Sequence, residues 1–160
     1  MSVKKSIYKV QKYTFFVGIV LLNPPFFVSS HYNWYKMGKK VNFHTLGCKL
    51  NYSESSTIAR EFEQGGFIRV SPNESADISI INSCSVTEHA DKKCRNIIRK
   101  IHRRNPDAII AVTGCYAQLK PYEIAAIDGV DIVLSNNNKG ETYKRVLELT
   151  AKGKTQVFSC

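Results

Sequence analysis

The chain has 160 residues, of which 43% are hydrophobic and 22% are charged, and this mixture is typical of one globular domain. It excludes collagen-like, intrinsically disordered and multi-span membrane proteins. The formal net charge of +10 favours a polyanionic partner such as nucleic acid, and the odd count of five cysteines excludes a fully paired disulfide framework in a monomer.

The first 36 residues differ in composition from the rest of the chain. They hold five lysines and no acidic residue, so half of the net charge lies there. Residues 15–22 form an apolar run that is shorter than the roughly 20 residues a membrane-spanning helix needs. A basic start and a short apolar run resemble a secretory signal peptide, whereas Met37 is a second candidate for the true start. We expect residues 1–36 to be an extension, disordered or not native, that lies outside the fold.

Beyond residue 36 the sequence alternates between strand and helix patterns. Residues 40–45 alternate apolar and polar side chains as a strand does. Asn51 and Glu54, three residues apart, form a capping-box pattern that predicts the start of a helix, which Gly65 ends. Residues 67–70 predict a short second strand.

The rest of the chain repeats this alternation. A second capping box, at Ser85 and Glu88, predicts a helix that ends before Pro106. The elements expected after residue 70 are strands at 77–82, 108–113 and 130–134 and helices at 85–104, 121–127 and 141–151. Strands separated by helices imply a parallel sheet with right-handed crossovers. The sequence therefore predicts one α/β domain over residues 37–152, with an open, mainly parallel sheet of about five strands and helices on both faces, as in flavodoxin-like or Rossmann-like folds.

Three cysteines lie shortly after predicted strands, in the loops that precede the next helices. They are Cys48, Cys84 and Cys115, which are 36 and 31 residues apart. In a parallel sheet such loops share the edge at the carboxyl ends of the strands, where open α/β folds bind ligands. Helix N-termini at this edge lower the pKa of a thiol and favour the thiolate, which is the form that binds metal. Three thiolates with one open position suit a soft metal or an iron–sulfur cluster, and ordinary packing of three small residues is the alternative.

The other two cysteines do not share this placement. Cys94 falls on the apolar stripe of the helix predicted at 85–104, so we expect it to pack in the core. Cys160 is the last residue and has no motif around it. His44, His89 and His102 are candidate additional ligands if the site binds zinc instead of a cluster.

Each of the three strand-end cysteines belongs to a longer motif. The motifs are Thr45-Leu46-Gly47-Cys48-Lys49-Leu50-Asn51, Asn82-Ser83-Cys84-Ser85-Val86-Thr87 and Val112-Thr113-Gly114-Cys115-Tyr116-Ala117-Gln118. Together they resemble the N-terminal domain of the radical-SAM methylthiotransferases, and the resemblance covers residues 37–152. It implies that Cys48, Cys84 and Cys115, called the motif cysteines below, hold an auxiliary 4Fe–4S cluster. The fourth iron of that cluster stays open, and sulfur destined for the substrate is attached there.

The residues of the first motif are similar to those of one branch of this family. Leu-Gly-Cys-Lys-Leu-Asn resembles the branch that modifies threonylcarbamoyladenosine beside the tRNA anticodon. The isopentenyladenosine branch and the ribosomal-protein branch are the alternatives. The resemblance implies a cytoplasmic enzyme with tRNA as its partner, and neither a membrane nor DNA.

The chain departs from the family pattern in one large respect. The family's Cys-x-x-x-Cys-x-x-Cys loop, which serves a second 4Fe–4S cluster and S-adenosylmethionine in a following barrel domain, is absent from the 160 residues. We therefore expect an N-terminal fragment that binds the auxiliary cluster, contains no catalytic residue, is inactive alone, and has the start of a linker at 153–160. The alternative is a stand-alone flavodoxin-like module that binds zinc or a small ligand at the same edge.

A basic helix and one asparagine complete the candidate residues. The helix at 85–104 carries Lys92, Lys93, Arg95, Arg99, Lys100, Arg103 and Arg104. Of these, Arg99, Lys100, Arg103 and Arg104 are candidate contacts for RNA phosphates, and a solvated helix face is the alternative. Asn51 is expected to cap its helix and is a candidate for lining the cluster pocket.

Overall fold

The computed structural model of the protein describes residues 38–149 and 156–158. The extension expected at residues 1–36, the alternative start at Met37 and the terminal Cys160 lie outside the described residues. Within the described part, no helix has the length and apolar character needed to cross a membrane.

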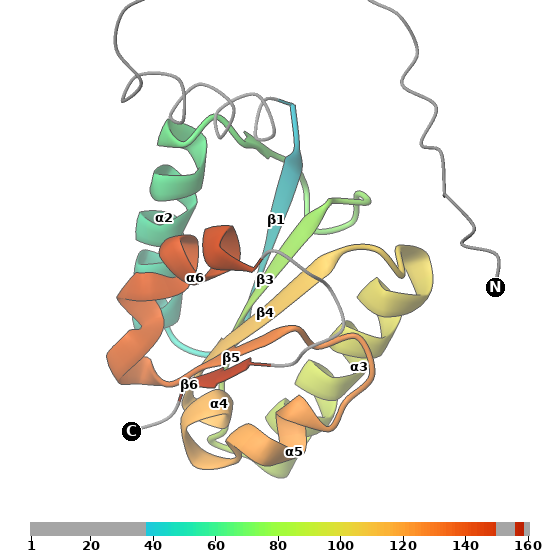
Figure 1. The fold of residues 1–160 in the computed structure, drawn as a ribbon. Coiled ribbons are helices and arrows are strands. Elements are labelled where there is room, and N and C mark those ends of the chain that lie inside the picture. The colour runs from blue at the N-terminus through green and yellow to red at the C-terminus, as the bar shows by residue number, and fades with distance from the viewer. Residues whose placement is uncertain (1–37, 150–155, 159–160) are drawn as a thin grey trace, which may run out of the picture.

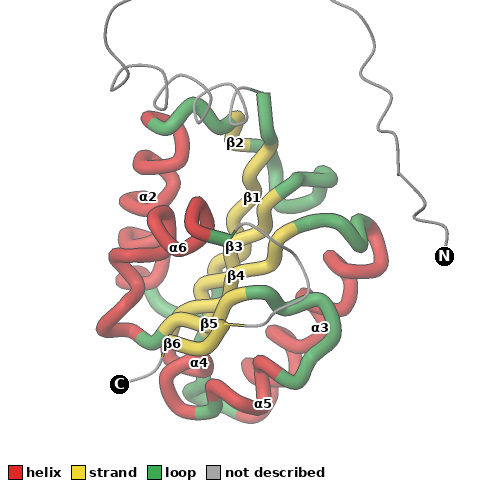
Figure 2. The backbone as a smooth tube through the Cα atoms, viewed as in Figure 1, coloured by secondary structure: helices red, strands yellow, loops and turns green. Residues whose placement is uncertain are grey.

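The strands of the described chain form one parallel sheet in the order β2-β1-β3-β4-β5-β6 (Figures 1 and 2). They are β1 (Lys40–Thr45), β2 (Ile68–Arg69), β3 (Ile78–Ser83), β4 (Ile109–Gly114), β5 (Ile132–Leu134) and β6 (Gln156–Phe158). The α/β class and the parallel sheet are confirmed. The sheet has six strands instead of about five, because β6 pairs with β5 beyond residue 152, where the sequence predicts the end of the domain.

The order of the strands reverses between β1 and β3. After β1 the chain adds β2 on one side, and after β3 it adds every further strand on the other side. In open parallel sheets such a reversal creates a crevice at the carboxyl ends of the two strands, where ligands bind. The loop after β1 carries Cys48 and the loop after β3 carries Cys84. The topology therefore places two of the motif cysteines at the switch point.

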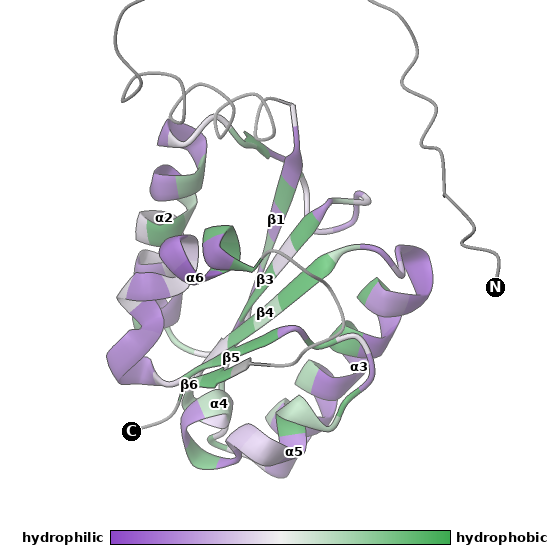
Figure 3. Cartoon of the chain, in the orientation of Figure 1, coloured by the Kyte–Doolittle hydropathy of each residue, from purple (hydrophilic) through white to green (hydrophobic). Residues whose placement is uncertain are grey.

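Helices cover both faces of the sheet (Figure 1), as predicted. One face packs against α2 (Lys49–Gln64) and α6 (Thr142–Glu148), and the other against α3 (Glu88–Arg104), α4 (Cys115–Leu119) and α5 (Pro121–Ala125). A 3-10 helix, η1 (Asn136–Glu141), leads from β5 into α6. Hydrophobic residues concentrate on the central strands, and hydrophilic residues on the outer sides of the helices (Figure 3). Two apolar layers therefore hold the helices to the sheet.

Cys94 lies in one of these layers, as the helical pattern predicts. Its side chain is fully buried on α3 beside Ile98 and Ile101. The opposite layer is organised around Phe62 of α2, whose ring makes edge-on contacts with Phe43, Phe67 and Tyr143 at centroid distances of 5.9, 5.2 and 5.1 Å. Such edge-to-face packing is the favoured geometry for aromatic rings.

The start of α2 differs from the predicted capping box. The N-cap residue is Cys48, and Asn51 lies inside the helix with its side chain buried. The Asn51 amide donates to the carbonyl oxygens of Leu46 at 2.7 Å and Ser83 at 3.3 Å. The prediction that Asn51 caps the helix is wrong, because the amide satisfies two buried loop carbonyls that the local sequence does not reveal.

The start of α3 also differs from prediction. Thr87 is the N-cap, and its hydroxyl accepts a hydrogen bond from the N–H of Ala90 at 3.2 Å. The Ser85 hydroxyl instead donates to Asp91 Oδ1 at 2.7 Å. The sequence pattern placed the cap two residues too early, because Ser85 has a charged acceptor within reach in the folded protein.

His44 on β1 gives the stability of this fold a pH dependence. Burial, together with the nearby charges of Arg104 and Lys100, lowers the pKa of His44 to about 4. In the unfolded chain the same side chain titrates near pH 6.5. The unfolded chain therefore binds more protons between these two values. The contribution of neutral His44 to the free energy of unfolding is fully present above about pH 6.5 and is lost as the pH falls toward 4.

A His44→Gln variant tests this effect. We expect the free energy of unfolding of the wild type to fall more between pH 7 and pH 5 than that of the variant. Urea unfolding followed by circular dichroism at several pH values measures both slopes. Identical slopes in the two proteins would contradict the assignment to His44.

Candidate functional site

The ends of β1, β3 and β4 and the segments that follow them contact one another at the carboxyl edge of the sheet. The N–H of Leu46 donates to the carbonyl of Asn82 at 2.9 Å, and the Asn51 amide reaches the carbonyl of Ser83. The Ser83 hydroxyl in turn donates to the carbonyl of Thr113. Each of these segments carries a motif cysteine within two residues of a bonded residue. Cys115 directly follows β4 as the first residue of α4, so the prediction that it lies in a loop is wrong. The structure therefore brings together the three segments that hold the motif cysteines.

Two glycines allow this close approach. Gly47 has a φ of +97°, and a Cβ at this position would lie 2.7 Å from Cys84 Cβ and 2.8 Å from Cys84 Sγ. Gly114 has a φ of +99°, and a Cβ there would overlap the backbone of Ser83. Any other L-residue would meet both a strained backbone and a steric clash at these positions. The Gly-Cys pairs of the first and third motifs are therefore required by the packing of the loops.

The motif cysteines differ in exposure. Cys48 is exposed, Cys115 is half-buried and Cys84 is buried. Cys48 sulfur forms no capping hydrogen bond with the helix, but the backbone N–H groups of Asn51 and Leu50 lie close enough to hold the pKa of its thiol below the ordinary value. The start of α2 thus favours the thiolate of Cys48, which is the form that binds metal and reacts with electrophiles.

Cys94 provides an internal comparison for this reactivity. Burial raises the pKa of the Cys94 thiol to about 12. We expect iodoacetamide at neutral pH to modify Cys48 first and Cys94 only after unfolding, because alkylation requires an accessible thiolate. Mass spectrometry of peptides after timed labelling measures this order. Equal rates at the two cysteines in the folded protein would contradict it.

A buried carboxylate joins two of the cysteine segments. Asp91 on α3 is 3% exposed and accepts hydrogen bonds from the Ser85 hydroxyl at 2.7 Å and from Lys120 Nζ at 3.1 Å. Ser85 follows Cys84 directly, and Lys120 follows the short helix that begins at Cys115. The sequence pattern does not distinguish Asp91, because an acidic residue near the start of a helix is common for electrostatic reasons alone.

Asn136 is a second residue that sequence analysis missed. It begins η1 directly after β5, and its side-chain Nδ2 lies 4.0 Å from Cys115 Sγ. Its backbone N–H donates to Gln118 Oε1 at 3.0 Å, which ties η1 to α4. One sequence feature could have identified Asn136 as a site residue: it lies just beyond a predicted strand, at the same edge as the cysteines.

The histidines do not join the cysteines. His44 lies near Lys100 and Arg104, and His102 lies against Gly129, where an added Cβ would be 2.5 Å from the imidazole ring. Within residues 38–149 and 156–158, no three His, Cys, Asp or Glu side chains are grouped as ligands of a single metal ion. This arrangement gives no support to the zinc alternative. An iron–sulfur cluster requires a different spacing of ligands, because each thiolate binds a separate iron and the thiolates lie farther apart than the ligands of one metal ion.

The basic residues of α3 divide between two sides of the helix. Lys100 and Arg104 lie near His44, and the Arg104 guanidinium also donates to the carbonyl of Asn73 at 2.8 Å. Arg99 and Arg103 instead line a groove beside α5. The four candidate RNA contacts are therefore divided between two adjacent stripes of the helix, and only Arg99 and Arg103 line the groove.

Most of the large apolar side chains that are exposed lie close in sequence to a motif cysteine. Of the six that are exposed in the described part of the chain, five lie within seven residues after a motif cysteine, and only Ile68 does not. The five are Leu50, Tyr52, Val86, Leu119 and Tyr122. Exposed apolar side chains grouped in this way are typical of a surface that another polypeptide segment covers.

Comparison with known proteins finds a family model and several curated relatives that match this chain. Residues 40–135 match the model of a family described as "Uncharacterized protein family UPF0004". Threonylcarbamoyladenosine tRNA methylthiotransferase MtaB of Bacillus subtilis is 50% identical over 99 residues, which cover 62% of this chain and 22% of that protein. The protein of the same name from Aquifex aeolicus is 40% identical over 118 residues, which cover 74% of this chain and 29% of that protein.

A relative with a different name is also similar. The tRNA-2-methylthio-N(6)-dimethylallyladenosine synthase of Aquifex aeolicus is 34% identical over 106 residues, which cover 64% of this chain and 24% of that protein. The matched part of the chain thus spans about a quarter of the length of the curated relatives. The matched residues include all three motif loops in the family model.

Proposed function

Because the chain belongs to the family UPF0004, we propose that it is the domain of a tRNA methylthiotransferase that holds the auxiliary 4Fe–4S cluster. The relatives named as threonylcarbamoyladenosine enzymes match at 40% and 50% identity, against 34% for the dimethylallyladenosine synthase. We therefore assign threonylcarbamoyladenosine beside the tRNA anticodon as the substrate nucleoside. The reaction takes place in the cytoplasm, where thiols are kept reduced.

The contact between the three segments that carry the motif cysteines is the observation that supports this proposal. Gly47 and Gly114 bring the first and third motifs against the β3 loop that carries Cys84. The resulting donor set, three thiols with no fourth cysteine at this edge among the described residues, fits a 4Fe–4S cluster with one open iron. When bound, the cluster supplies an iron site at which sulfur for the substrate is attached.

The protein's own residues prepare this edge for the cluster. The N–H groups at the start of α2 stabilise the thiolate of Cys48, which removes part of the cost of deprotonating a ligand. Asp91 holds the Cys84 loop to the segment after Cys115 through Ser85 and Lys120. Outer contacts of this kind fix the orientation of ligands and so contribute to metal affinity.

The remaining chemistry belongs to other parts of such an enzyme. We place S-adenosylmethionine and the second 4Fe–4S cluster outside these 160 residues, since the relatives are about four times longer than the matched segment. The exposed apolar side chains that follow the motif cysteines in sequence support the inference that another segment of the enzyme covers this edge. The 160-residue chain alone would then bind the cluster without completing the transfer.

A chimeric enzyme tests the proposed function. Residues 40–135 replace the matching segment of the Bacillus subtilis relative in a strain that lacks that enzyme, and tRNA nucleosides are analysed by mass spectrometry. We expect the 2-methylthio form of threonylcarbamoyladenosine to reappear with the chimera and its Cys94→Ala control. The chimera with all three motif cysteines changed to Ala should leave the nucleoside unmodified. Methylthiolation of isopentenyladenosine, or none by a folded, iron-loaded chimera, would contradict the assignment.

A further inference from the structure

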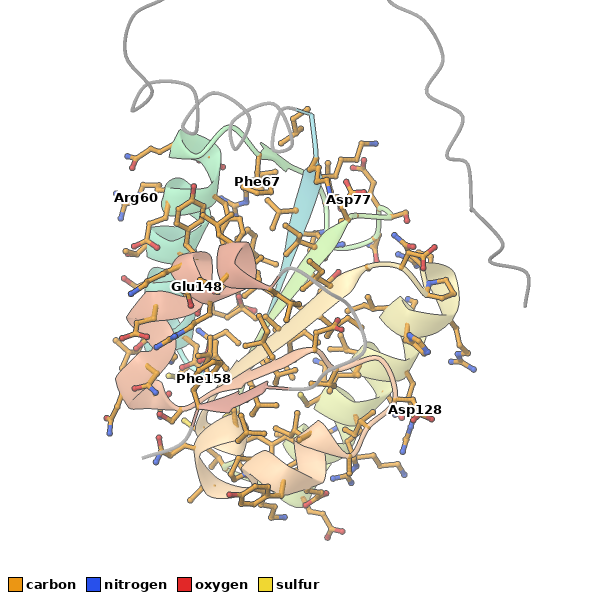
Figure 4. All side chains as sticks on the ribbon, in the orientation of Figure 1. Arg60, Phe67, Asp77, Asp128, Glu148 and Phe158 are labelled. Atoms are coloured by element: carbon orange, nitrogen blue, oxygen red, sulfur yellow. The ribbon has the colours of Figure 1, made fainter. Side chains whose placement is uncertain are left out.

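A groove of about 790 Å³ runs between α3 and α5, on the face of the sheet opposite α2. Its lining includes Arg95, Arg99 and Arg103 from α3 and Ala126, Ile127 and Asp128 from the end of α5 and the turn after it. Asp128, labelled in Figure 4, lies on that turn beside α3. The groove does not include any motif cysteine, so it is a site separate from the one described above.

The charged side chains on the α3 wall of the groove are all basic. Arg95, Arg99 and Arg103 line the groove from α3, and the acidic residues in its lining are Glu123 and Asp128. Glu123 also lines the groove, but Arg95 holds it at 2.9 Å and Lys120 lies 3.7 Å from it, so its charge is already compensated. The helix therefore presents an excess of positive charge to any ligand in the groove.

Two of the arginines in the groove have no internal partner. Arg95 donates to Tyr116 Oη at 2.7 Å as well as to Glu123, which fixes its position. Arg99 and Arg103 are exposed and form no hydrogen bond or ion pair with the residues that the structure describes. Their guanidinium groups are therefore available for an anion, and the guanidinium fork matches the geometry of a phosphate group.

The spacing of these arginines suits a chain of phosphates. Residues four apart in an α-helix are about 6 Å apart along its axis, which is comparable with the separation of successive phosphates along an RNA strand. α3 begins at the cysteine edge, and Arg99 lies about 16 Å along the helix from its first residue. We propose that Arg99 and Arg103 bind successive phosphates of the RNA substrate, whose backbone then leads along α3 toward the motif cysteines. The choice of RNA among polyanions rests on the proposed function.

Two variants with the same loss of charge test this proposal. Arg99→Gln/Arg103→Gln removes two charges from the groove, and Lys100→Gln/Arg104→Gln removes two from the other side of the same helix. Affinity of the full chain for a fluorescent anticodon stem-loop RNA is measured by anisotropy over a series of salt concentrations. We expect the groove variant to lose affinity about tenfold or more and to reduce the salt slope by about 1.5. The control variant should lose less than about threefold.

The outcomes separate this site from the cluster site. Equal losses in the two variants would show dependence on net charge alone and overturn the proposal, as would an unchanged affinity of the groove variant. Tighter binding of a duplex DNA of equal charge would overturn the choice of RNA. The variant with three motif cysteines changed to Ala should bind RNA normally, and the groove variant should load iron normally. Failure of iron loading in every protein would count against the proposed function and leave the RNA result standing.

Discussion

Replacing the three motif cysteines by alanine should abolish iron binding by this chain. After anaerobic reconstitution with iron and sulfide, we expect the wild type to hold about four irons per chain and the variant less than about one tenth of that. The reason is that thiolates supply all the expected protein ligands, and alanine leaves none. Iron and sulfide analysis, together with the visible absorbance of the brown protein, measures the effect.

The matched control is Cys94→Ala, which also removes a thiol from the same domain. Cys94 is fully buried among apolar side chains on α3, so its loss should leave the iron content unchanged. Circular dichroism of both variants confirms that the fold is retained. Retention of the full iron content by the triple variant would contradict the assignment of the motif cysteines.

Gly114→Ala should destabilise the domain by about 3 kcal/mol or more, because two costs add at this position. The left-handed backbone at φ +99° disfavours any residue with a Cβ. The new Cβ would also overlap the Ser83 backbone and lie 2.7 Å from Asn82 Oδ1. Ser83 is paired with Gly114 in the β3–β4 ladder, so the backbone has little freedom to move away.

Gly66→Ala provides the control for this substitution. Gly66 has a similar φ of +88°, but an added Cβ would meet no atom within 4 Å. We expect this variant to lose only about 1 kcal/mol, from the backbone conformation alone. Urea unfolding measures both values. Equal losses would show that the contact between the β3 and β4 loops does not constrain Gly114.

The strands of the central sheet could be predicted because their signal is local. The alternating pattern at residues 40–45 coincides with β1, and the strands predicted at 77–82 and 108–113 differ from β3 and β4 by one residue at each end. Short elements could not be predicted in the same way. Helix α4 has five residues and η1 has six, which is too few to display a helical period. Strand β6 could not be predicted from its local sequence, because it is defined by its pairing with β5, which lies earlier in the chain.

The candidate site could be predicted only in outline. Strand and helix order was sufficient to place the motif cysteines at one edge, because parallel strands end there together. The partners of those residues could not be foreseen, since they come from distant segments. Asn51 bonds to Ser83 instead of capping its own helix, and Asp91 bonds to Lys120, which lies 29 residues away. Sequence alone also did not reveal that α3 divides its basic residues between two sides.

Mössbauer spectroscopy of the chain reconstituted with iron-57 tests the central claim most directly. Three protein thiolates on a 4Fe–4S cluster leave one iron with a different ligand, so the account predicts two iron environments in a ratio of about three to one. Addition of a small thiol should shift only the minor component. Four equivalent irons that do not respond to the thiol, or a mononuclear iron spectrum, would contradict a cluster held by Cys48, Cys84 and Cys115.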